Sequence, residues 1–363
     1  MRSALVLGLS LLFTGSALAA PPPMDALKLP PGFSISVWTD KVPDAREMAL
    51  GTKDIVFVGS RDSGKVYAVS YEGDKVTKVR TIATGLEMPV GVAFRKGDLY
   101  VSAVSRIVVL RDIENHLDDP PKPEVVNDKL HPETHHGWKF IAFGPDDKLY
   151  VPTGAPCNIC DRNTEGFAQI VRMNPDGTGS QVVARGVRNT VGFDWRPTDK
   201  TMWFTENGRD MMGDDMPSDE LNHVTKPNEH FGYPYCHQGD TLDPEFGKGK
   251  SCKDYTPPVL KLGAHVASLG MRFYQGKQFP APYQGAIIIA EHGSWNRTKK
   301  SGYRVMTVRL NGNKVASYEP LVDGFVADEK ALGRPADVQA LPDGSLLVSD
   351  DLNGVIYRVT YKK

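Results

Sequence analysis

The chain has 363 residues, a formal net charge of -1 and a hydrophobic content of 40%. These values describe a globular protein with enough apolar residues for a core, and they exclude a disordered or collagen-like chain. The 43 basic and 44 acidic residues nearly balance, and no long basic run carries interleaved aromatic residues. We therefore expect no nucleic acid and no anionic membrane as the main partner.

The first twenty residues, MRSALVLGLSLLFTGSALAA, combine one arginine, a short apolar run and a small-residue end. This pattern is typical of a secretory signal peptide, and its apolar run is too short for a membrane anchor. We place the signal peptide at 1–19, a proline-rich linker at 20–32 and one folded domain at 33–363. No later segment has the length of a transmembrane helix. The mature protein is predicted to be exported, either periplasmic or secreted, without membrane insertion.

Short apolar strand cores recur along the rest of the chain, namely IVFV at 55, LYV at 99, LYV at 149, MWF at 202, AIII at 286 and LLV at 346. Each follows another short strand and a turn with Gly, Asp or Lys, and most precede a third strand. Six antiparallel units of this kind indicate an all-β fold, a six-bladed β-propeller of four-stranded blades. A β-sandwich pair or a barrel would lack six similar units in register. We expect the strand FSISVW at 33 to pair with the last blade and close the ring.

One interval between units is much longer than the others, because 85 residues separate Trp203 from Ile288 (288 minus 203). We assign the extra segment, from Gly208 to Ala264, to the fourth blade as a long insertion. Propellers accept such insertions in the loops between strands, where binding and catalytic residues are often found.

The four cysteines form two close pairs in the sequence. Cys157 and Cys160 belong to a CNIC segment, and Cys236 and Cys252 are sixteen residues apart. In an oxidising compartment this spacing predicts two local disulfides, Cys157–Cys160 and Cys236–Cys252. A c-type haem site would require a histidine after CNIC, where this chain has Asp161.

Cationic and hydrogen-bonding residues precede the innermost strands of several predicted blades. Aligning the units on their turns places His136, Arg188 with Asn189, and Arg334 in equivalent positions, and a looser alignment adds Arg46, Glu87 and His265. Innermost strands begin at the central channel on one face, where the loops TENGRDMMGDDMPSDE, AEHGSWNR and SDDLNG also open. A single such residue is usually a surface residue. Several from different blades predict a concave binding site.

The segment from Glu206 to Asn222 is rich in carboxylates, with Asp210, Asp214, Asp215, Asp219 and Glu220. Calcium binds hard oxygen ligands of this kind, but the spacing is not that of an EF-hand. A calcium site and a solvated acidic loop therefore both fit the composition. The chain has no zinc motif, P-loop, dinucleotide fingerprint or GxSxG elbow, so nicotinamide chemistry and serine hydrolysis lack their usual sequence support.

Several segments together resemble the quinoprotein sugar dehydrogenases, in particular the branch called sorbosone dehydrogenase-like. They are RNTVGFDWRP at 188, ENGRD and SDELN from 206, FGYPYC at 231, ASLGMRFY at 267, AEHGSWNR at 290 and GRPADVQALPDGSLLVSD at 333. The resemblance extends from about Pro30 to Tyr361, and the combination of HGWK-FGPD, GxRN and EHGSWNR is specific. It implies a soluble six-bladed propeller that uses pyrroloquinoline quinone (PQQ) and Ca²⁺ to oxidise an aldose, a sorbosone-like aldehyde or a related alcohol.

The resemblance also implies roles for residues at the quinone. His136 matches the catalytic base, and Arg188 and Asn189 match a pair that contacts the quinone or the substrate. Arg334 matches an arginine that contacts the carboxylates of the quinone. Because the quinone carries three carboxylates, we expect arginines to neutralise them, and Arg46 and Arg297 are further candidates.

The resemblance implies calcium ligands in the acidic segment. Asn207 and Gly208 would offer backbone carbonyls to the calcium that the quinone binds, and Asp219 and Glu220 would hold further calcium. Two departures from the glucose-oxidising members are visible. Ala336 replaces a second cationic residue in the last blade, and the fifth-blade lysine has no clear counterpart, although His292, Asn296, Arg297 or a nearby lysine could substitute for it.

Two other functions fit a six-bladed propeller. One is a calcium-dependent lactonase-type hydrolase, whose channel metal is held by carboxylates and amides and activates water. The arginines and histidines predicted at the channel count against it. The other is a non-catalytic carbohydrate-binding propeller. A dehydrogenase needs an external electron acceptor, a quinone or a cytochrome, and the absence of a cytochrome domain implies that this acceptor is a separate partner.

Overall fold

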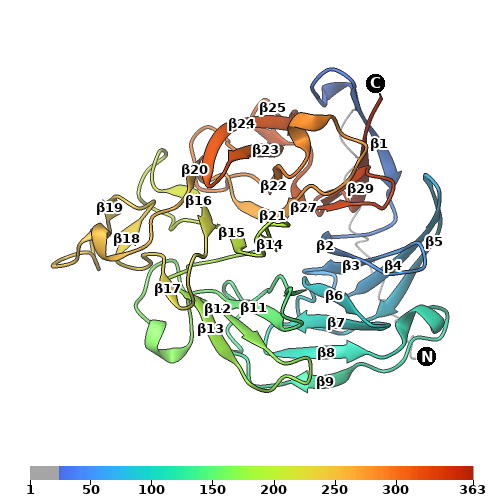
Figure 1. Cartoon of the computed structure of the whole chain (residues 1–363), viewed down its shortest axis with the longest axis horizontal. Coiled ribbons are helices and arrows are strands. Elements are labelled where there is room, and N and C mark those ends of the chain that lie inside the picture. Colours follow the sequence, from blue (N-terminus) through green and yellow to red (C-terminus); the bar gives the residue numbers. More distant parts are fainter. Residues whose placement is uncertain (1–23, 363) are drawn as a thin grey trace, which may run out of the picture.

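The structure is a computed structural model that describes residues 24–362, and it consists of β-sheets arranged in a ring (Figure 1). The signal peptide predicted at 1–19 lies outside the described residues. Six sheets of four or five strands form the blades, which confirms the predicted all-β, six-bladed propeller. None of the helices within residues 24–362 is long and apolar enough to cross a membrane.

Each of the first three blades begins near the axis with its earliest strand. The first contains β2 (Ala45–Leu50), β3 (Ile55–Ser60), β4 (Val66–Glu72) and β5 (Lys75–Ala83). The second contains β6 (Val92–Arg95), β7 (Asp98–Ala103), β8 (Arg106–Leu110) and β9 (Glu124–Asn127). The third contains β10 (Ala142–Phe143), β11 (Leu149–Thr153), β12 (Gln169–Met173), β13 (Gln181–Arg185) and β17 (Glu229–His230).

The remaining blades follow the same order, except for the closing strand. The fourth contains β14 (Phe193–Trp195), β15 (Met202–Glu206), β16 (Ser218–His223) and β20 (Leu260–Ala264). The fifth contains β21 (Ser268–Phe273), β22 (Ile287–Glu291), β23 (Arg304–Asn311) and β24 (Lys314–Val322). The sixth contains β27 (Pro335–Ala340), β28 (Leu346–Asp350), β29 (Val355–Tyr361) and β1 (Phe33–Thr39).

Short elements lie in the loops between these strands. They are the hairpins β18 (Cys236–His237) with β19 (Thr241–Leu242) and β25 (Val326–Ala327) with β26 (Lys330–Ala331), and five 3₁₀ turns, η1 (Met24–Ala26), η2 (Ile113–Asn115), η3 (Asn163–Glu165), η4 (Cys252–Asp254) and η5 (Ala281–Tyr283). The absence of longer helices from the described residues agrees with the lack of helical periodicity in the sequence.

The first strand of the chain closes the ring, as predicted. β1 pairs antiparallel with β29, with Phe33 opposite Tyr361, and so forms the outer strand of the sixth blade. The segment before β1 also packs on the propeller, because Leu27 is buried and Lys28 forms a β-bridge with Asp323. The two ends of the described chain are therefore fixed to the same part of the ring.

The long insertion lies in the fourth blade, as predicted, but it is divided by a strand. One part connects β15 to β16, and the other, residues 224–259, connects β16 to β20. The second part contributes β17, which adds in parallel to β13 and so links the insertion to the third blade. The sequence did not predict this strand, because two residues are too few to show any periodicity.

The hydrophobic core is divided into six main clusters, one between each pair of consecutive blades. Phe57 and Val101 meet between the first and second blades, for example, and Trp203 and Ile289 meet between the fourth and fifth. Middle strands are covered by a neighbouring blade on both faces, so β3 is buried along its whole length. No blade has a core of its own, and each needs both neighbours.

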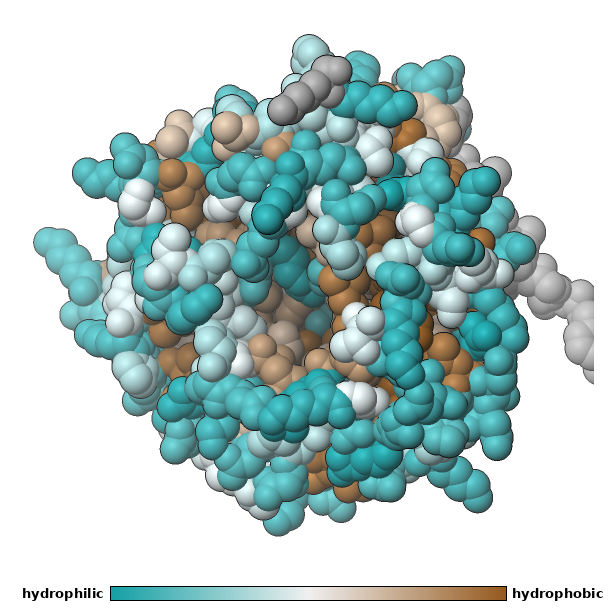
Figure 2. All heavy atoms as spheres, turned by 45° about the vertical axis from the view of Figure 1, so that its right-hand side comes forward, coloured by the Kyte–Doolittle hydropathy of each residue, from teal (hydrophilic) through white to brown (hydrophobic). Residues whose placement is uncertain are grey.

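Side-chain hydroxyls fix the innermost strands to the preceding blade. Ser102 Oγ donates to Lys139 O over 2.8 Å, Thr205 Oγ1 to Leu269 O over 2.6 Å, and Ser349 Oγ to Arg46 O over 2.8 Å. All three acceptors lie at or just before the start of an innermost strand, which is where the sequence predicts the site residues. Figure 2 shows that the face turned to the viewer is mostly hydrophilic around its edge and hollowed near its middle.

Candidate active site

A cavity of about 320 Å³ opens where the innermost strands begin. Its lining comes from the starts of innermost strands and from the loops after second strands, as the propeller geometry predicts. The lining residues are Arg46, Arg61, His136, Trp138, Arg188, Asn189, Asn207, Gly208, Asp210, Asp219, His265, Ala267, Leu269, His292, Gly293, Ser294, Trp295 and Arg334.

Most of the site residues predicted from the sequence come together in this cavity. His136, Arg188, Asn189, Arg334 and Arg46 all line it, although they belong to four different blades. The predicted metal-binding residues Asn207, Gly208 and Asp219 line it as well.

Several predicted positions do not line the cavity, among them Asn296, Asp214 and Asp215. Arg297 lies at its edge, where Nε donates to Asp214 O over 3.0 Å and Nη2 pairs with Asp215. Glu220 is buried behind the cavity wall, and its carboxylate accepts from Gln238 N over 2.7 Å. Glu87 is exposed.

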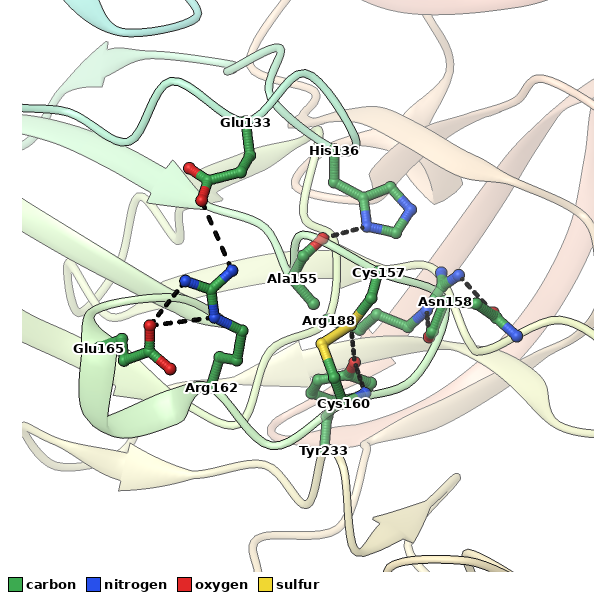
Figure 3. Close-up of a disulfide and its surroundings, with 10 residues drawn as sticks. All are labelled: Glu133, His136, Ala155, Cys157, Asn158, Cys160, Arg162, Glu165, Arg188 and Tyr233. Atoms are coloured by element: carbon green, nitrogen blue, oxygen red, sulfur yellow. Dashed lines mark hydrogen bonds and ion pairs between the residues drawn. A yellow bond between two sulfur atoms is a disulfide. The ribbon is translucent and has the colours of Figure 1, made fainter.

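The His136 side chain is held in one orientation by a backbone carbonyl. Its Nδ1 lies 2.8 Å from Ala155 O, so Nδ1 carries the hydrogen and Nε2 keeps its lone pair (Figure 3). Gly154 makes this close approach possible, because a Cβ there would lie 2.6 Å from the Cβ of His136. Burial, followed by the charges of Arg188 and His135, holds the pKa of His136 well below its ordinary value. His136 is therefore a neutral base near pH 7.

Arg188 is the most extensively bonded cation in the cavity. Nε donates to Asn158 O over 2.8 Å, Nη1 to Asn207 O over 3.2 Å, and Nη2 to both Asn158 Oδ1 and Asp210 Oδ2. Its backbone N–H donates to Glu206. These contacts fix the plane of a buried guanidinium against the cavity.

A second group of polar residues lines the cavity from the first, fifth and sixth blades. Asp351 pairs with Arg46 over 2.6 Å and accepts from His292 Nε2 over 2.9 Å. Burial alone would raise the pKa of Asp351, but the charges of Arg46 and His292 hold it below its ordinary value. Burial lowers the pKa of His292 to about 4. Asp351 thus orients two cavity-lining side chains at once.

Three arginines of the cavity have nitrogen atoms that no hydrogen-bond acceptor in residues 24–362 satisfies. These are the buried Nε atoms of Arg46, Arg61 and Arg334. The only side-chain hydrogen bond of Arg334 in this region runs from Nη2 to Gly293 O over 3.4 Å. Buried guanidinium donors without acceptors favour a bound anion such as a carboxylate.

The predicted calcium residues form the part of the cavity near β16. Both carboxylate oxygens of Asp219 accept backbone hydrogens, from Gly208 N over 2.9 Å and from Ser268 N over 3.0 Å. Burial raises the pKa of Asp219 to about 7, and it does the same for Glu220. Within residues 24–362, no three His, Cys, Asp or Glu side chains are grouped so that they alone could hold a metal ion. A cation here would need carbonyl or cofactor oxygens as well.

Aromatic side chains add an apolar surface to the cavity. Trp138 lies under the guanidinium of Arg61, whose Cζ is 4.3 Å from the ring centroid. Trp295 lies at the cavity mouth with 68% of the residue exposed. The loop that carries Trp295 is held by hydrogen bonds from Ser294 N to Ser301 O and from Tyr303 OH to Ser294 O.

Sequence reasoning missed several residues of the site. Arg61 directly follows a second strand, the position from which the other predicted loops were chosen, and Trp138 is two residues after His136. Both could have been found by applying the alignment to every blade. Asp351 belongs to the SDDLNG loop that the sequence places at this face, but its pairing with Arg46 has no local signal. Asn158 has none either, because its contact with Arg188 joins residues far apart in the sequence.

Comparison with known proteins places the chain in a family. Residues 27–362 match the family described as TrAA12-like. The chain belongs to this family. An uncharacterized protein of Borreliella burgdorferi is 33% identical over 367 residues, which cover 97% of this chain and 95% of that protein.

Solved structures of related proteins share the fold of this TrAA12-like chain. The calcium structure of the Trichoderma reesei AA12 enzyme has a TM-score of 0.82 at 18% identity, covering 96% of this chain and 100% of that one. The holo PQQ domain of Coprinopsis cinerea pyranose dehydrogenase has a TM-score of 0.80 at 18% identity, covering 94% and 98%. The predicted resemblance to this family of six-bladed propellers is confirmed.

Proposed function

We propose that this protein is an exported quinoprotein oxidoreductase that oxidises a sugar by hydride transfer to PQQ and passes the electrons to an external quinone or cytochrome. Its family and the names of its structural neighbours support sugar oxidation. The observation that carries the proposal is the cavity itself. It combines a neutral, oriented histidine with four arginines from three blades.

The residues of the cavity fit the quinone. PQQ carries three carboxylates, and Arg46, Arg188 and Arg334 are available to them in one cavity. The buried Nε atoms of Arg46 and Arg334 lack acceptors within the described chain, as expected for donors to a bound anion. Asn207, Gly208 and Asp219 would hold the Ca²⁺, with Glu220 behind them. When bound, the quinone would accept hydride, and the metal would polarise it as a Lewis acid.

His136 would act as the general base. Nε2 would take the proton from the substrate hydroxyl, while the hydrogen bond from Nδ1 to Ala155 O keeps the ring in place. Burial keeps the imidazole neutral and therefore able to accept that proton. Arg188 would bind and orient the reacting group next to His136, and its fixed guanidinium would favour negative charge there.

The mouth of the cavity supports a sugar substrate. A pyranose or furanose ring has an apolar face of C–H groups and an edge of hydroxyls. Trp295 would offer a flat surface to the face, and the arginines, histidines and Asn189 of the cavity would bind the hydroxyls. Export is supported by the two disulfides, Cys157–Cys160 and Cys236–Cys252, which the structure confirms and which are typical of oxidising compartments.

Reconstitution of the purified protein tests the proposal. The protein is mixed with Ca²⁺ and PQQ, and dye reduction is followed with aldoses, sorbosone-like aldehydes and simple alcohols. We expect turnover that requires both additions, is lost in His136→Ala and is largely retained in His116→Ala. His116 is a suitable control because it is exposed and does not line the cavity.

A negative result would favour one of the two other functions. No dye reduction with any substrate, together with no PQQ binding in an absorbance titration, would overturn the proposal. Calcium-dependent lactone hydrolysis without a dye would then favour the hydrolase, and sugar binding without turnover would favour a binding protein.

A further inference from the structure

A small disulfide loop lies directly beside the cavity. Cys157 and Cys160 are bonded, so the loop closes around only Asn158 and Ile159 (Figure 3). Neither cysteine lines the cavity. The loop belongs to the connection between β11 and β12, next to Ala155.

The residue inside the loop holds Arg188. The carbonyl of Asn158 accepts from Nε over 2.8 Å, and its side-chain Oδ1 accepts from Nη2 over 2.9 Å. Asn158 is itself fixed to the acidic loop, because Oδ1 also accepts from Asp210 N over 2.8 Å and Nδ2 donates to Asp210 O over 3.0 Å. Two of the acceptors of Arg188 thus belong to a residue between the bonded cysteines.

The same connection also holds His136. Ala155 O accepts from Nδ1 of His136 over 2.8 Å, while Ala155 N donates to Arg188 O over 2.8 Å. Ala155 lies two residues before Cys157. A movement of this short segment would therefore change the orientation of both side chains.

Apart from the hydrogen bonds of Asn158, few contacts fix the disulfide loop. Its packing consists of a small cluster in which Cys157 and Ile159 contact Ala155, Ala168 and Tyr233, separate from the clusters between blades. Tyr233 OH accepts from Cys160 N over 3.0 Å. A disulfide that closes so short a loop constrains little of the unfolded chain. Its main effect is on local geometry.

We propose that the Cys157–Cys160 disulfide is a redox-sensitive clamp that positions Arg188 and His136, so that its reduction lowers activity in this protein. A dithiol reductant attacks one sulfur, the S–S bond breaks, and two thiols form while the dithiol becomes a disulfide. Both cysteines are partly exposed, whereas in the other disulfide Cys252 is partly exposed and Cys236 is only 2% exposed. Partly exposed disulfides are generally the more readily reduced. The inference rests on the proposed function, and Asn158 acts in it as a positioning residue.

Serine variants of the two disulfides test the clamp. We expect Cys157→Ser/Cys160→Ser to bind PQQ at least ten-fold more weakly in an absorbance titration and to lose at least ten-fold in kcat. Cys236→Ser/Cys252→Ser is the matched control and should retain most of both. Treatment of the wild-type protein with dithiothreitol should reproduce the loss and reoxidation should reverse it, so the test does not depend on the folding of a variant. Unchanged PQQ binding and kcat after the first disulfide is opened would overturn the proposal.

Asn158 allows a finer test. Asn158→Ala removes the Oδ1 contact with Arg188, whereas Asn158→Asp keeps an acceptor there and should recover most of the loss. Asn163→Ala is the control, because Asn163 lies in the same connection but donates only to Tyr233 O. Equal losses in the Ala and Asp variants would contradict a positioning role.

A measurement without cofactor separates this inference from the proposed function. The ring of His136 can be followed by NMR in the apo-protein, with His136→Gln used to assign its signal. Opening the disulfide should move the pKa of His136 upward, toward its ordinary value, because the ring gains solvent and Arg188 moves away. An unmoved titration would reject the clamp even in an active enzyme, and a moved one would support it even if no sugar were oxidised.

Discussion

His136 and His292 both line the cavity and are almost equally buried, with 8% and 7% of each residue exposed. They differ in the group that holds them. A backbone carbonyl holds His136 on the wall formed with Arg188 and Asn158, which we call the loop wall. The carboxylate of Asp351 holds His292 on the wall formed with Arg46, which we call the carboxylate wall.

The difference shows how one cavity can contain two histidines with separate roles. A carbonyl determines which nitrogen carries the hydrogen without adding charge, so His136 remains a neutral base with a free Nε2. A carboxylate places His292 beside a charged group, because Asp351 pairs with Arg46, while burial lowers the pKa of His292 itself to about 4 and keeps its ring neutral near pH 7. We therefore assign proton transfer to the loop wall and anion binding to the carboxylate wall.

The largest expected effect comes from exchanging the two histidines for glutamine. His136→Gln removes the base and should lower kcat by about 10² to 10⁴, the usual range for a general base. His292→Gln keeps a donor toward Asp351 and should lower kcat by less than about ten-fold. Steady-state kinetics of the reconstituted protein measure both. A larger loss in the His292 variant would reverse the assignment of the walls.

We expect the carboxylate wall to contribute more than the loop wall to the free energy of unfolding. Asp351→Asn breaks a buried ion pair and leaves Arg46 uncompensated, so we expect the free energy of unfolding to fall by about 3 kcal/mol. Urea denaturation of the apo-protein measures this change. Asp62→Asn is the control, because Asp62 is 74% exposed and its pairing with Arg61 should contribute less than about 1 kcal/mol. Equal effects would mean that Asp351 does not stabilise the wall.

The pH dependence of kcat/KM should follow the protonation of His136 in the loop wall. His136 must be neutral to act, and its pKa is lowered by burial, by Arg188 and by His135. We expect kcat/KM to stay level as the pH falls through 6.5 and to decrease only at lower pH. A decrease in kcat/KM centred at or above pH 6.5 would contradict the assigned base.

The free energy of unfolding should also fall as the pH drops below 6.5, because the unfolded chain binds protons that the buried histidines do not.

The smallest effect is expected at the mouth, which belongs to neither wall. Trp295→Ala removes an exposed aromatic surface, and a loss of about 1 kcal/mol in substrate binding would raise KM by about five-fold. Trp295→Phe should retain most of the affinity, and kcat should hardly change in either variant. A fall in kcat with constant KM would show that Trp295 acts on the reacting centre instead.

The fold was predictable because its signals are local and repeated. Each blade has its own turn and its own apolar middle strand, so LYV at 149 and LLV at 346 indicate the same unit without knowledge of the rest. The propeller geometry then placed His136, Arg188 and Arg334 at one cavity, since strand starts share a face. The register of six repeats thus determined the position of the site.

The rest of the site depends on contacts that no local pattern encodes. The sequence places Arg297 in a loop at the correct face but does not show that its side chain is bound by Asp214 and Asp215. Asp219 and Glu220 are adjacent, yet alternation along β16 directs only one of them to the cavity. The hydrogen bond between Arg188 and Asn158 joins residues thirty positions apart in the sequence, so no periodic pattern indicates it.

The pairing of β1 with β29 has a consequence for biosynthesis. Phe33 emerges from the ribosome early, but its partner Tyr361 is made 328 residues later (361 minus 33). Because no blade in the described residues has a core of its own, the growing chain cannot complete its cooperative structure before Tyr361 has been made. Contacts between such distant residues also slow folding. The ring therefore closes only after the sixth blade is available, and until then the earlier blades stay loosely folded.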